Sequence, residues 1–136
     1  MLPTKNINKG FTLVEILITL SIAAVIITFS YFFYSGYLAS IKLNAAAIQI
    51  SSDLRSSQNS AKIEQITYTV EFFPDYYLIN DKKEIQLPSG VTAEPKVFKF
   101  ADSGFPPPGY SGTLTLYCQD KTRKVIVSSV GRIRTE

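Results

Sequence analysis

The sequence predicts an α+β fold in which one long N-terminal helix, membrane-spanning in its first half, packs against an antiparallel β-sheet head. Three features of the 136 residues indicate this architecture. A long uncharged stretch near the N-terminus is followed by apolar positions at helical spacing, with no proline between Pro3 and Pro74. Beyond residue 64 the apolar period changes from about 3.6 to about 2, which is typical of half-buried strands.

Residues 11–41 are expected to form the membrane-spanning half of the helix. Glu15 is the only charged residue among them, and residues 16–34 are uncharged and mostly apolar. Crossing the hydrocarbon core of a bilayer requires roughly 20 such residues. The alternative is a buried helix of a soluble domain, but the rest of the chain is too small to enclose a helix that is apolar on every side.

The flanks of this stretch predict its orientation. Lys5 and Lys9 precede it with no acidic residue, so the N-terminus should stay in the cytoplasm and the head should lie outside it. A secretory signal peptide is the alternative, but its apolar core would be shorter and a small-residue cleavage site would follow. Here residues 31–34 are aromatic, as at a membrane interface. We therefore expect a single-pass protein of the inner (cytoplasmic) membrane.

Residues 42–63 are expected to form an amphipathic second half of the same helix. Their apolar positions include Leu43, Ala47, Ile50, Leu54 and Ala61, with charged residues between them. One continuous helix is therefore predicted from about residue 11 to about residue 63. Such a helix half needs a surface to pack against.

Residues 64–136 are expected to supply that surface as an antiparallel sheet. The predicted strands are residues 66–72, 76–79, 84–87, 97–100, 113–119 and 123–130. The sequence places the last hairpin turn around Asp120-Lys121-Thr122, and the proline-rich residues 103–109 cannot form a regular strand. A module of this size has a marginal core by itself, so the helix should complete it.

The composition excludes several classes of function. The chain has no His and a single Cys, so it lacks a disulfide framework, the ligands of a Cys/His zinc site and the base of a Ser-His or Cys-His pair. We expect no catalytic residues, no metal, no cofactor and no small-molecule substrate. Cys118 alternates with Leu114 and Leu116 and is best interpreted as a small buried hydrophobe.

The residues that precede and open the apolar stretch form a motif: Lys9-Gly10-Phe11-Thr12-Leu13-Val14-Glu15. It resembles the type III signal of type IV prepilins and pseudopilins. The resemblance implies that residues 1–10 are a leader peptide, that a prepilin peptidase cuts after Gly10, and that the new amine of Phe11 is methylated. It also implies storage in the inner membrane, followed by assembly with other pilins or pseudopilins through an assembly platform into a filament.

Glu15 is unusual because a carboxylate within an apolar span costs about 2.5–3.5 kcal/mol at a helix centre and less near the interface. One interpretation is that Glu15 lies shallow enough to stay hydrated. The other is a role in filament assembly, in which Glu15 pairs with the N-terminal amine of a neighbouring subunit and sets the axial register.

The C-terminal half resembles the FimT/GspH-like minor pilins and pseudopilins. The residues that carry this resemblance are Phe98, Phe100, Gly104, the run Gly112-Thr113-Leu114-Thr115-Leu116, the run Val125-Ile126-Val127-Ser128, Gly131 and Arg132. The architecture that this family implies, a long helix laid against a β-sheet head, agrees with the periodicity.

These resemblances imply two alternative functions. The first is a structural subunit that helps to initiate or cap a type IV pilus or a type II secretion pseudopilus. The second is DNA capture for natural transformation through the basic residues Lys121, Arg123, Lys124, Arg132 and Arg134. Gly131-Arg132-Ile133-Arg134 resembles the tail through which some FimT-like proteins bind DNA. The alternatives for this tail are a solvated edge strand protected by charge and a docking site for a protein partner.

Overall fold

The computed structural model describes residues 11–136, apart from the side chains of Phe32, Phe33 and Ser35. The predicted leader, residues 1–10, lies outside this part. The chain divides into two compact units, Met1–Gly36 and Tyr37–Glu136. One helix, α1 (Leu13–Glu64), contributes to both units. The predicted α+β class, with one long N-terminal helix and antiparallel strands, is confirmed.

In the first unit, the described side chains of α1 are exposed on every side. The helix has no apolar stripe there, since almost every position is apolar. Its hydroxyl side chains bond to carbonyl oxygens of the preceding turn: Thr19 to Ile16, Ser21 to Leu17, Thr28 to Ala24 and Ser30 to Ile26. Every one of these hydroxyls therefore has a partner on its own helix, which suits a segment surrounded by lipid. The helix is long and apolar enough to cross a membrane.

In the second unit, one stripe of α1 is buried. The predicted stripe Leu43, Ala47, Ile50, Leu54 and Ala61 is confirmed, and Ala39, Ala46 and Ser57 extend it. The helix ends after Glu64, where Gln65 takes a left-handed conformation with φ of 55°.

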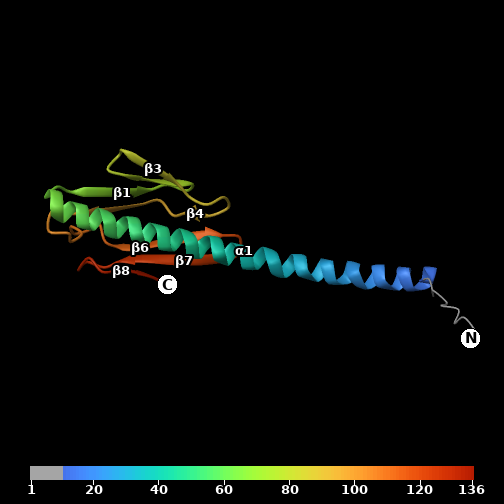
Figure 1. Cartoon of the computed structure of the whole chain (residues 1–136). Coiled ribbons are helices and arrows are strands. Elements are labelled where there is room, and N and C mark those ends of the chain that lie inside the picture. The colour runs from blue at the N-terminus through green and yellow to red at the C-terminus, as the bar shows by residue number, and fades with distance from the viewer. Residues whose placement is uncertain (1–10) are drawn as a thin grey trace, which may run out of the picture. The chain divides into compact units, whose positions relative to one another are not determined.

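The head contains two four-stranded antiparallel sheets. The first has the order β3-β2-β1-β5 and is built from β1 (Tyr68–Phe72), β2 (Tyr76–Ile79), β3 (Lys83–Gln86) and β5 (Lys96–Phe100). The second has the order β4-β6-β7-β8 and is built from β4 (Thr92–Ala93), β6 (Gly112–Cys118), β7 (Lys121–Val127) and β8 (Ile133–Thr135). In the view of Figure 1, β1 lies above the second half of α1, and β7 and β8 lie below it.

The division into two sheets differs from the single sheet that the sequence predicts. It arises because β5 pairs with β1, whereas β6 pairs with β7 and β4. The proline-rich segment between β5 and β6 separates the two sheets along the chain. The short strands β4 and β8 are not among the predicted strands.

The core of the head lies between α1 and the two sheets. Phe72 stacks on Tyr77 with ring centroids 5.1 Å apart and meets Phe98 edge-on at 5.9 Å. The predicted burial of Cys118 is confirmed: its side chain is 5% exposed, on the same face of β6 as Leu114 and Leu116.

Candidate functional site

Two predicted site residues, Phe11 of the processing site and Glu15 of the assembly site, lie at the start of the described chain, where α1 begins. Phe11 is 83% exposed, while Gly10 lies outside the described residues. Glu15 Oε2 accepts hydrogen bonds from the Thr12 backbone amide (3.0 Å) and the Thr12 hydroxyl (3.1 Å). In return, Thr12 Oγ1 accepts from the Glu15 amide at 3.2 Å.

This reciprocal arrangement is a capping box, the T-x-x-E pattern that satisfies two of the unpaired amides at a helix N-terminus. The sequence analysis missed it, although Thr12 and Glu15 stand at the required spacing. Glu15 therefore has a role within its own chain: it stabilises the first turn and holds its carboxylate close to Phe11. The capping box gives a structural reason, within a single chain, for a charged residue at this place in an apolar helix.

The second candidate site is the basic set of the C-terminal hairpin, and the strand register divides it between two faces. Lys121 and Arg123 pair with Cys118 and Leu116, so their side chains emerge on the face of the sheet that carries the core. Lys124 pairs with Thr115 and emerges on the opposite, outer face.

Arg132 and Arg134 lie on the same outer face as Lys124. Both arginines are exposed and Ile133 between them is buried, so they point away from the core. Arg134 pairs with Ile126 in the ladder between β7 and β8, and the Arg132 carbonyl accepts from the Ser128 amide at 3.0 Å. The structure thus brings Lys124, Arg132 and Arg134 together as an outer strip and separates Lys121 and Arg123 from it.

The turn of this hairpin explains the separation. It consists of Gln119, with φ of 53°, and Asp120, because Cys118 pairs directly with Lys121. The predicted turn around Asp120-Lys121-Thr122 is therefore wrong, and Lys121 belongs to β7. Lys121 Nζ donates to Ser40 Oγ of α1 at 2.6 Å.

The tail that carries the arginines is an ordered edge strand held by two side chains of α1. Arg55 Nη2 donates to the Ile133 carbonyl at 3.2 Å. Gln58 Nε2 donates to the carbonyls of Gly131 (2.9 Å) and Gly104 (2.8 Å). The sequence analysis missed both side chains because their partners lie far away along the chain.

The ion pair on this tail is weak. Arg134 Nε lies 3.6 Å from Glu136 Oε1, and both side chains are more than half exposed. A solvated pair of this kind contributes little to stability and can exchange its partner. Arg134 is therefore accessible to another anion.

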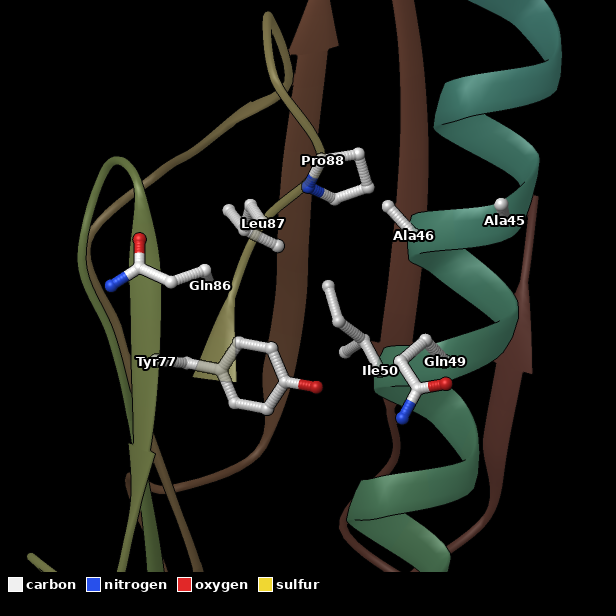
Figure 2. Close-up of a pocket in the computed structure, with 8 residues that line it drawn as sticks. All are labelled: Ala45, Ala46, Gln49, Ile50, Tyr77, Gln86, Leu87 and Pro88. Carbon is white, nitrogen blue, oxygen red and sulfur yellow. The ribbon is translucent and has the colours of Figure 1, made fainter. Parts of the chain in front are cut away.

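A recess between α1 and the first sheet has a volume of about 220 Å³. It is lined by Ala45, Ala46, Gln49, Ile50, Tyr77, Gln86, Leu87 and Pro88. Figure 2 shows the Tyr77 ring reaching from β2 toward Ile50. The Tyr77 hydroxyl donates to the Asp53 carboxylate, and burial together with this bond raises the pKa of Tyr77. The lining residues are uncharged and mainly apolar.

Comparison with known proteins supports both the N-terminal motif and the fold. Residues 5–31 match the family model described as the prokaryotic N-terminal methylation motif. Two crystal structures of the type IV minor pilin FimU of Pseudomonas aeruginosa resemble the fold. One has a TM-score of 0.61 and 16% identity, and the likeness covers 74% of this chain and 92% of FimU.

The other crystal form of FimU gives a TM-score of 0.57 and 17% identity over 69% of this chain and 92% of that one. The chain has the N-terminal motif and the fold of a type IV pilin. At this level of identity the likeness to FimU establishes the pilin fold and no more. No curated protein sequence matches the chain. The apolar helix half and the methylation motif together indicate that this pilin-like chain is anchored in a membrane through its N-terminus.

Proposed function

We propose that this chain is a minor pilin or pseudopilin, a non-catalytic subunit that helps to initiate or cap the filament of a type IV pilus or a type II secretion pseudopilus. The observation that carries the proposal is the methylation motif at the start of a helix whose first half is apolar all round and whose second half supports a pilin-like head. Its partners are the prepilin peptidase, other pilins or pseudopilins, the assembly platform and the inner membrane.

Deleting the protein tests this role directly. The deletion strain should lose surface filaments or the secretion of exoproteins, and the full chain supplied in trans should restore the loss. Loss of surface filaments would identify a type IV pilus, and loss of exoprotein secretion would identify a type II secretion pseudopilus. Normal filaments together with normal secretion would contradict the proposal.

Maturation is the first molecular step of the proposed function. The peptidase cuts after Gly10, where the absence of a side chain leaves the peptide bond accessible, and Phe11 becomes the methylated N-terminus. Mass spectrometry of the membrane-extracted protein should find a chain that starts at N-methylated Phe11. A chain that starts at Met1, or near residue 35, would reject this step in favour of an uncleaved anchor or a secretory signal.

Glu15 has two candidate roles, and one pair of variants separates them. Glu15→Gln keeps a side chain that can complete a capping box but removes the charge that would pair with a neighbouring N-terminal amine. Glu15→Ala removes both. If charge pairing sets the register of the filament, both variants should fail to enter filaments. If only the cap matters, Glu15→Gln should enter them normally. The readout is the amount of the subunit in sheared filaments relative to the membrane.

The outer strip supports a second candidate function, DNA capture. Lys124, Arg132 and Arg134 share one exposed face, and a short edge strand offers no helix to read a groove. Contact should therefore be with phosphates, independent of sequence, with a Kd on the order of 10⁻⁴–10⁻⁶ M at physiological salt.

A salt titration with the full-length protein in neutral detergent tests DNA capture. Replacing Arg132 and Arg134 by Ala should reduce the salt slope by about two phosphate contacts. The matched control replaces Lys121 and Arg123, which removes the same charge from the opposite face of the sheet. Equal losses from both pairs would mean a non-specific effect of charge, and no binding at low salt would end the DNA proposal.

A further inference from the structure

Two cations of the predicted basic set, Lys121 and Arg123, remain without a function once the outer strip is separated from them. Both are exposed and emerge on the same face of β7. The hydrogen bond from Lys121 Nζ to Ser40 Oγ places this end of the hairpin beside the start of the second unit, four residues after Gly36.

Lys42 brings a third cation to the same level of α1, two positions after Ser40. Its Nζ donates to the Ser89 carbonyl at 2.8 Å and lies 3.4 Å from the Ser89 hydroxyl. The turn between β6 and β7 is thus tied to Ser40 by Lys121, and the loop around Ser89 is tied to α1 by Lys42. Ser40 and Lys42 are two positions apart, so these contacts lie at the same level of α1 but on different sides of it. We call Lys42, Lys121 and Arg123 the proximal patch.

The distance of the proximal patch from the bilayer follows from the chain itself. The aromatic run of residues 31–34, which has the composition of a membrane interface, ends at Tyr34. A helix rises about 1.5 Å per residue, so Ser40 lies at most about 9 Å from Tyr34. The headgroup layer on each side of a bilayer is roughly 5–8 Å thick. The upper limit on the distance between Ser40 and Tyr34 depends only on the short length of chain that joins them.

The residues around this junction have the composition of a membrane interface. Tyr34 and Tyr37 are 63% and 66% exposed, and tyrosine is enriched at the depth of the headgroups. The patch adds three positive charges, of which Asp120 in the neighbouring turn offsets one. Each Lys or Arg close to an anionic bilayer surface increases the equilibrium constant for contact with that surface about fivefold.

We infer that the proximal patch rests on anionic phospholipid headgroups of the membrane that holds the first unit, and so fixes the head against the bilayer before assembly. The inference goes beyond the proposed function and rests on its membrane anchor. Extraction into a filament would then have to break these contacts, which gives lipid composition an influence on the pool of stored subunits.

The test uses the full-length protein in nanodiscs of phosphatidylcholine, with or without phosphatidylglycerol. A fluorophore is attached at Gln119→Cys, in a Cys118→Ala background, and a lipid with a nitroxide on its headgroup acts as quencher. Quenching should be several-fold stronger with phosphatidylglycerol. Replacing Lys121 and Arg123 by Gln should remove this difference between the two lipids.

The matched control replaces Lys82 and Lys83 by Gln at the turn between β2 and β3. The Asn80 amide of that turn bonds to the Thr69 carbonyl, only a few residues beyond the end of α1, so these lysines lie far from Ser40. Their replacement should leave quenching unchanged.

Equal quenching in both lipids of the labelled protein that keeps Lys42, Lys121 and Arg123 would overturn the inference, and this arm needs no change in the proximal patch. A difference between the two lipids that survives the loss of Lys121 and Arg123 would also overturn it. A protein that does not enter nanodiscs at all would instead contradict the membrane anchor of the proposed function, so the two failures are distinguishable.

Discussion

The two halves of helix α1 share one backbone geometry but have different surroundings. In the first unit the described side chains of the helix are exposed and apolar on all sides, and its hydroxyls bond to the helix's own carbonyls. In the second unit one stripe is buried, and Lys42, Arg55 and Gln58 donate to carbonyls of distant loops and strands. The first half is built for lipid or for other apolar helices, and the second half is one wall of a protein core.

The largest expected effect comes from removing the second half of the helix. A fragment of residues 37–136 keeps the buried stripe, including Ala39, and should unfold cooperatively. A fragment of residues 64–136 exposes the core faces of both sheets and should not fold. Thermal melts followed by circular dichroism would measure whether each fragment unfolds cooperatively, and the dispersion of amide chemical shifts in NMR spectra would show whether it is folded. A cooperative melt of residues 64–136 would show that the helix does not complete the core.

A single truncation in each half should separate their roles. Leu54→Ala, at a position that is fully buried, should destabilise the head by about 2–5 kcal/mol, because it leaves a cavity in the core. Leu20→Ala, at a position 63% exposed in the first half, should change the unfolding free energy of the head by less than about 0.5 kcal/mol. Urea unfolding of the full-length protein in detergent compares them. Similar losses from both would mean that the halves are not energetically distinct.

A smaller effect tests the polar contacts of the second half. Gly131 and Gly90 both have positive φ, 74° and 85°, so Ala at either position should cost about 1–2 kcal/mol. A Cβ on Gly131 would lie 2.6 Å from Gln58 Nε2, whereas a Cβ on Gly90 would meet open space. Gly131→Ala should therefore cost about 1 kcal/mol more, the value of a displaced hydrogen bond. Equal shifts of the urea midpoint would mean that Gln58 does not hold the tail.

The smallest effect near neutral pH concerns Tyr77, whose hydroxyl bonds to Asp53 of the second helix half. Because burial and this bond raise the pKa of Tyr77, the folded state favours the protonated phenol. Its contribution is complete below the unfolded pKa of about 10 and should fall as pH rises above it, by at most about 1.4 kcal/mol per pH unit. Tyr77→Phe should lose less stability over that range, and parallel pH profiles of the two proteins would contradict this role.

Much of the fold could be predicted because the signals are local. The helical spacing of Leu43, Ile50 and Leu54 identified the buried stripe, and alternation identified strands of four or more residues. Strands β4 and β8 have only two and three residues, too few to show a period. Within the candidate site, the sequence identified the motif around Phe11 and Glu15, but the capping box was overlooked although its spacing is local.

The sequence by itself determined an apolar, then amphipathic helix followed by antiparallel strands, since composition and periodicity act over a few neighbouring residues. Only the tertiary structure decided that the strands form two sheets and that the basic residues occupy two surfaces. Side chains alternate between the faces of a strand, so moving a turn by one residue exchanges the faces. The pairing of Cys118 with Lys121 sends Lys121 toward Ser40 and Lys124 to the outer strip. That register depends on contacts between residues far apart in the chain, and no local pattern contains them.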